Sequence, residues 1–130
     1  MTRRPPEPAA DAIRYVEWSV GAPIPKQAFE KTGRFGAIDG VIHLAHDWGR
    51  TAQIQPSDLN VSGLKILLDA VRAHDVARVV LGSSLSANRD ALSKYGRTKW
   101  QMEQLLAGAG EVVARIGLVY GGAEKALSAR

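Results

Sequence analysis

The chain of 130 residues contains no cysteine, which excludes disulfide bonds and thiolate chemistry. Without disulfides to indicate an oxidising compartment, we expect a cytoplasmic protein. No apolar run approaches the roughly 20 residues that a membrane-spanning helix needs. Met1 is followed by arginines and prolines rather than by the apolar core of a signal peptide. The sequence therefore predicts no membrane partner.

Concentrated positive charge is also missing, since 17 basic residues are set against 13 acidic ones and the net charge is only +4. The basic residues are dispersed and are not interleaved with aromatic residues, so no nucleic-acid partner is expected. His43 and His46 are close enough in sequence to share a metal ion. No third ligand has suitable spacing, so no metal site is predicted.

Apolar patterning between the two tails predicts one domain in which strands and helices alternate. Residues 1–11 form a Pro- and Arg-containing tail without expected regular structure, and residues 123–130 form a short C-terminal tail. The expected elements are strands over Ile13–Val20, Val41–Ala45, Val76–Leu81 and Glu111–Ile116, helical turns around Lys26–Lys31, a helix opened by Pro56, and a helix over Ala91–Ala107. This alternation indicates an α/β fold, with right-handed crossovers and a parallel sheet of about four strands.

The spacing of Tyr95 and Lys99 indicates a site for proton transfer. Tyr95 and Lys99 are four residues apart, which places them on one face of a helix, and Ser84 directly follows a buried strand. Ligands in open α/β sheets bind at the carboxyl ends of strands, so the three side chains could converge on one small molecule. A phenol ionises near pH 10 in water, and an adjacent ammonium favours its ionised form. Such a set suits proton transfer to an alcohol or carbonyl. The alternatives are a surface Tyr and Lys on an amphipathic helix, and a Ser that only caps a turn.

Several motifs, in order, resemble the extended short-chain dehydrogenase/reductase superfamily in its NAD-dependent epimerase/dehydratase branch. They are the strand at Val41–Ala45, the Asn-x-x-Gly of Asn60 to Gly63, the strand at Ala77–Ser84, the Tyr-x-x-x-Lys of Tyr95 to Lys99, and the strand and loop at Arg115–Gly121. The resemblance implies a partial Rossmann-like sheet. It also implies NAD or NADP as cofactor, with hydride and proton transfer at a hydroxyl or carbonyl carbon of a small molecule such as a nucleotide sugar.

The resemblance also implies roles for individual residues. Tyr95 would be the general acid/base, Lys99 would bind the nicotinamide ribose, and Ser84 would hydrogen-bond the substrate oxygen. Asn60 would assist a proton relay, with a capping or solvent-facing Asn as the alternative. Because Trp48 lies just past the end of the strand predicted at Val41–Ala45, we also expect it to border the cofactor cleft. The implied cofactor-binding positions are Leu44, Ala45, His46, Ser83, Tyr95, Lys99, Ile116 and Gly117.

Two departures from the family pattern shape the expected activity. The chain has no Gly-x-x-Gly-x-x-Gly, the turn whose backbone N–H groups hold the cofactor pyrophosphate, and it lacks the family's C-terminal substrate-binding part. Residues 12–122 are thus expected to be an internal segment of a NAD(P)-binding domain, with weak or absent dinucleotide affinity. Apolar faces left uncovered would invite self-association. A non-catalytic Rossmann-like scaffold or binding module is the alternative. His46 and Ile116 also depart from the residues usual in the family.

Overall fold

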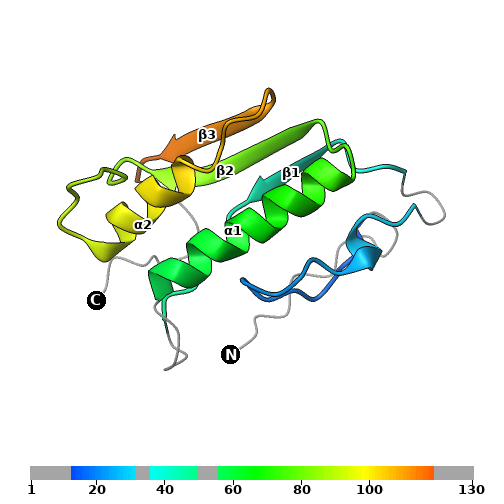
Figure 1. Ribbon diagram of the computed structural model, residues 1–130, viewed down its shortest axis with the longest axis horizontal. Helices are drawn as coiled ribbons and strands as arrows, with labels where there is room; N and C mark the ends of the chain where they lie inside the picture. Colours follow the sequence, from blue (N-terminus) through cyan, green and yellow to red (C-terminus); the bar gives the residue numbers. More distant parts are fainter. Residues whose placement is uncertain (1–12, 32–35, 50–55, 119–130) are drawn as a thin grey trace.

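The computed structural model describes residues 13–31, 36–49 and 56–118. The two predicted tails, 1–11 and 123–130, lie outside these residues. The elements follow one another along the chain as the 3-10 turn η1 (Lys26–Ala28), strand β1 (Gly40–His43), helix α1 (Pro56–Ala73), strand β2 (Arg78–Ser84), helix α2 (Lys94–Glu103) and strand β3 (Glu111–Ile116) (Figure 1).

The three strands form an open parallel sheet in the order β1-β2-β3. Gly40 to His43 pair with Arg78 to Leu81, so β2 extends beyond the last paired residue of β1. Helix α1 leads from β1 to β2 and α2 leads from β2 to β3, and both helices lie over the same face of the sheet (Figure 1). The predicted α/β fold with a parallel sheet is confirmed. The described part of the chain holds three strands, not the expected four.

The expected strand at Ile13–Val20 is wrong, because this segment forms no strand and runs beside α1 instead (Figure 1). It ends in a turn in which Ala22 N–H donates to the Ser19 carbonyl at 3.0 Å. A Cβ on Gly63 of α1 would come within 2.8 Å of both Val20 and the Gly21 nitrogen, so the segment approaches the helix backbone closely there. Alternation of apolar residues supplies a buried face, but a strand also needs the edge of another strand to pair with.

Other boundaries differ from the predictions because local hydrogen bonds fix them. Val76 closes the turn after α1, with its N–H donating to the Val71 carbonyl at 2.9 Å, so β2 starts two residues later than Val76. Helix α2 begins after Ser93, whose Oγ accepts from Gly96 N–H at 3.0 Å, and is shorter than the expected Ala91–Ala107. Strand β1 ends at His43 rather than at Ala45. The strand at Glu111–Ile116 is confirmed.

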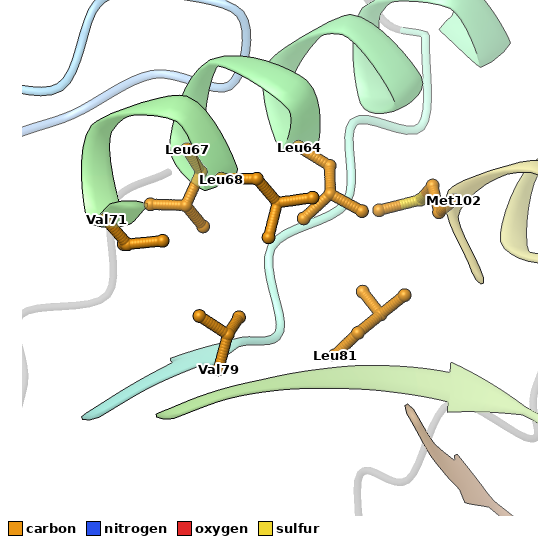
Figure 2. Packing of buried hydrophobic residues seen from close by; sticks show 7 residues of the cluster. All are labelled: Leu64, Leu67, Leu68, Val71, Val79, Leu81 and Met102. Carbon is orange, nitrogen blue, oxygen red and sulfur yellow. The ribbon is translucent and has the colours of Figure 1, made fainter. Parts of the chain in front are cut away.

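The core lies between the helices and one face of the sheet. Its fully or almost fully buried members come from α1, β2 and α2: Leu64, Leu67, Leu68, Val71, Val79, Leu81 and Met102 (Figure 2). Burial of each such side chain contributes about 1.5–3 kcal/mol. The apolar faces of the two helices meet in this cluster, with Leu105 and Leu106 packed at its edge just beyond the end of α2.

The other face of the sheet carries apolar side chains that no described element covers. Ile42 of β1 is 69% exposed, and Val112 and Ile116 of β3 are 52% and 45% exposed. Ile42 and Val112 share a face because both are in register with Val80. This uncovered face fits the predicted self-association, which remains a prediction. Over the described residues, no helix has both the length and the apolar character to cross a bilayer.

Candidate active site

A cavity of about 450 Å³ opens where the three strands end, and we call it the strand-end cavity. Leu44 follows β1, Ser83 and Ser84 end β2, and Gly117 follows β3. The described residues that line the cavity are Leu44, His46, Trp48, Gly82, Ser83, Ser84, Tyr95, Lys99, Ile116 and Gly117. The three residues expected to converge, Ser84, Tyr95 and Lys99, thus border one space.

A glycine lets α2 deliver Tyr95 and Lys99 to this cavity. A Cβ on Gly96 would collide with the Ser86 carbonyl oxygen and lie 2.8 Å from the Ala91 side chain. Only a residue without a side chain therefore allows the first turn of α2 to lie against the loop that follows β2. That contact places the helix beside the end of the strand that carries Ser84.

Lys99 is buried beside the tyrosine. The side chain is 3% exposed, and its Nζ donates to the Gly82 carbonyl at 2.7 Å, just beyond the last residue of β2 that pairs with β1. The same Nζ lies 5.7 Å from the centre of the Tyr95 ring, within range of a cation–π interaction. Burial lowers the pKa of Lys99 from its ordinary value, because removal from water penalises the charged form.

The two serines at the end of β2 have different partners. Ser84 Oγ accepts from Ser86 N–H at 3.2 Å and lies 3.0 Å from Ser86 Oγ. Ser83 Oγ donates to Glu103 at 2.5 Å, and Arg115 holds the same carboxylate with two bonds of 2.9 and 2.6 Å. Burial pushes the pKa of Glu103 upward, but hydrogen bonds from Arg115 and Ser83 outweigh it, so the pKa lies below its ordinary value. Ser83 therefore braces the helix against the sheet, whereas Ser84 faces the ligand space.

Three rings close one side of the cavity. The Trp48 and Tyr95 rings stack with centres 5.1 Å apart at 12°, and the His46 ring meets both edge-on at 4.6 and 5.0 Å. Trp48 remains 70% exposed, so its outer face is open to a ligand. The pKa of His46 is lowered, first by burial and then by the Lys99 charge, and its buried Nδ1 has no hydrogen-bond partner. The imidazole is thus neutral near pH 7.

Asn60 lies outside the strand-end cavity. It is 1% exposed, its Oδ1 accepts from Asp47 N–H at 2.8 Å, and its Nδ2 donates to the Asp47 carbonyl at 3.0 Å. Both bonds are made to main-chain atoms, so Asn60 holds the loop that carries His46 and Trp48. A separate cavity of about 250 Å³, which we call the side cavity, is lined by His46, Asp47, Trp48, Asn60, Lys94, Tyr95 and Thr98. In this structure Asn60 fixes the conformation of this loop, and its role in a proton relay stays a prediction.

All but one of the residues expected to bind the cofactor line the strand-end cavity. The exception is Ala45, which borders an apolar cavity of about 430 Å³ beside β1, together with Trp18 and His43. The sequence reasoning missed Gly82, whose position between a buried strand and two serines was the available signal. Within residues 13–31, 36–49 and 56–118, no group of three or more His, Asp or Glu is placed to hold a metal ion.

The strand-end cavity gathers hydroxyl and ammonium donors around one opening. Such a set can hydrogen-bond a carbonyl oxygen, polarise the C=O bond and deliver or remove a proton. No protein-family model, curated protein or solved structure matches this chain. Its function therefore has to follow from the chemistry of the site itself.

Proposed function

We propose that the strand-end cavity is the reacting site of an NAD(P)-dependent oxidoreductase of the epimerase/dehydratase type, built on part of a Rossmann-like domain. The observation that supports the proposal is the meeting of Ser84, Tyr95 and Lys99 in one cavity at the carboxyl ends of parallel strands. This is where α/β sheets bind ligands. The reaction is proton transfer, coupled to hydride transfer, at a hydroxyl or carbonyl carbon of a small molecule.

In this reaction Tyr95 is the general acid/base. Its hydroxyl gives a proton to the carbonyl oxygen in reduction and takes one from the alcohol in oxidation. The Lys99 ammonium, 5.7 Å from the ring centre, stabilises the negative charge that develops on the phenol oxygen. Ser84 Oγ accepts from Ser86 N–H, and with Ser86 Oγ as the donor in their 3.0 Å hydrogen bond the Ser84 proton goes to the substrate oxygen.

We expect the cavity to hold only one end of a dinucleotide. Leu44 and Ile116 fill the space beside Gly82 and supply apolar edges against which a flat ring can lie. A nicotinamide bound there would supply or accept the hydride. The sequence offers no Gly-rich turn for the pyrophosphate, so the affinity of this chain alone for NAD or NADP is expected to be weak or absent. A tight, stoichiometric titration with NADH or NADPH would contradict that expectation.

Turnover by the purified chain tests the proposal. Oxidation of NADH or NADPH, both at high concentration, is followed by absorbance against a panel of aldehydes, ketones and nucleotide sugars. Tyr95→Phe should lower the rate by about 10²–10⁴-fold, since it removes the transferred proton and keeps the ring. Tyr15→Phe is the matched control, because Tyr15 is 60% exposed and borders neither the strand-end nor the side cavity. Equal rates for the wild type and Tyr95→Phe would refute the assignment.

A non-catalytic scaffold or binding module is the second candidate function. The uncovered apolar sheet face around Ile42 and Val112 favours it, because such a face invites association with another protein or a second copy. Turnover and association assays distinguish the two candidate functions. Complete absence of turnover, together with association that is unchanged by Tyr95→Phe, would favour the scaffold.

A further inference from the structure

The Lys99 ammonium is buried without a negative partner. Lys99 takes part in neither the Arg72–Glu111 nor the Arg115–Glu103 salt bridge. Among the described residues, the only hydrogen bond of its ammonium is to the neutral Gly82 carbonyl, at 2.7 Å. A cation that is 3% exposed and unpaired is costly, and buried charges in proteins are normally paired.

Among residues 13–31, 36–49 and 56–118, no acidic side chain lines the strand-end cavity. The acidic residues nearby are engaged elsewhere. Glu103 is held by Ser83 and Arg115, and Asp47 lines the side cavity, where its Oδ1 accepts from Gly49 N–H at 3.0 Å. The lowered pKa values of His43 and His46, to which Lys99 contributes after burial, agree with an uncompensated positive charge at this point.

The cavity also holds more free donors than free acceptors. An ammonium has three N–H donors, and the Gly82 carbonyl uses one of those of Lys99. Ser84 has a hydroxyl proton to give when Ser86 Oγ is the donor in their 3.0 Å hydrogen bond. Within the described part of the chain the Tyr95 hydroxyl has no hydrogen-bond partner. A carboxylate is an acceptor with two oxygens and one negative charge, and it complements such a set.

We propose that the strand-end cavity binds a small carboxylate, with its charge paired to Lys99 and a neighbouring oxygen at Ser84 and Tyr95. The ligand class is a short 2-oxo or 2-hydroxy acid, or a larger substrate that presents this group. A carboxylate is favoured over a phosphate because the described residues of the lining include one ammonium and no arginine. As a statement about the substrate this rests on the proposed function, with Lys99 holding the substrate charge in place of the nicotinamide ribose that the family resemblance implies, and binding can be measured without turnover.

Oxamate and oxamide are the probes, because they have nearly the same size and differ in charge. Backbone amide shifts of the cofactor-free protein are followed by NMR during titration with each compound. Oxamate should shift the amides of Gly82, Ser84 and Gly117, and oxamide should bind about tenfold more weakly, the loss expected for one charge-assisted hydrogen bond. Equal affinities for the two compounds would overturn the proposal. Inorganic phosphate is the third probe, and affinity equal to or above that of oxamate would instead mark a phosphate site.

Two lysine variants locate the charge. Lys99→Met should weaken oxamate binding about tenfold or more. Lys94→Met is the matched control, because Lys94 lies on the same helix but lines only the side cavity, and it should leave the affinity unchanged. Should Lys99→Met fail to fold, the oxamate–oxamide comparison on the wild type decides alone. Tyr95→Phe separates the two proposals. It should lower turnover by about 10²–10⁴-fold, whereas oxamate loses one neutral hydrogen bond but keeps its charge partner Lys99, so its affinity should fall by less than about tenfold.

Discussion

Because of His43, the free energy of unfolding is expected to begin to fall near pH 6.5, above the pH at which carboxylates titrate. The side chain is 3% exposed, its Nε2 has no hydrogen-bond partner, and its ring meets the edge of Trp18 at 6.2 Å. Burial first, then the charges of Lys99 and His46, lower its pKa from 6.5 to about 4. In the folded protein the imidazole is therefore neutral at neutral pH.

The sign and size of the effect follow from this pKa. As the pH falls below 6.5 the unfolded chain binds a proton at His43, and the folded chain does not until about pH 4. The free energy of unfolding is therefore highest above pH 6.5 and falls towards pH 4. With about 1.4 kcal/mol for each pKa unit, the whole interval is worth about 3 kcal/mol, and the part between pH 7 and pH 5 about 2 kcal/mol.

Urea denaturation followed by tryptophan fluorescence at pH 7, 6 and 5 measures this loss. His43→Phe keeps an aromatic ring against Trp18 and removes the titration, so its free energy of unfolding should fall by about 2 kcal/mol less over the same interval. Parallel curves for the two proteins would refute the reasoning. If His43→Phe does not fold, an NMR titration of His43 in the wild type decides, and a midpoint near pH 6.5 is the refuting result.

Two further predictions concern the site. Lys99→Met should raise the pKa of His46, because a nearby positive charge that disfavours imidazolium is removed, and an NMR titration of the ring protons measures the change. An unchanged His46 midpoint would place the ammonium too far away to act on it. Gly96→Ala should lower the free energy of unfolding by about 1–3 kcal/mol, because the new methyl group would collide with the Ser86 carbonyl. Gly36→Ala is its control, since nothing lies within 4 Å of a Cβ there, and equal denaturation midpoints for the two variants would contradict the packing argument.

The alternation of apolar runs was enough to predict the alternating strands and helices of a parallel α/β sheet, because each run is a local signal of one element. The side chains of Leu64, Leu68 and Met102 in these elements form part of the core. Ile13–Val20 carries an equally clear strand pattern and forms no strand. Whether an edge is available for pairing depends on elements far away in the chain, and no local pattern contains that information.

The candidate site likewise combines local features, which the sequence shows, with contacts between distant segments, which it does not. The four-residue spacing of Tyr95 and Lys99, and the place of Ser84 at a strand end, are local features that led to one cavity. The stack of Trp48 on Tyr95 joins residues 47 positions apart, and the bonds of Asn60 to Asp47 cross between a helix and a loop. Such contacts depend on how the elements pack, so the sequence could place Trp48 near the cleft but could not show what it touches.

The hydrogen bonds between Asn60 and the loop at Asp47 have a consequence for which residues of this site can change in evolution. Its amide recognises the peptide group of Asp47 and not the Asp47 side chain, and every residue except proline offers the same N–H and C=O pair. The conformation of the loop is thus separable from the identity of its side chains. His46 and Trp48 are free to be exchanged by mutation on a fixed support, so ligand preference can drift at these two positions while the architecture beneath them stays intact.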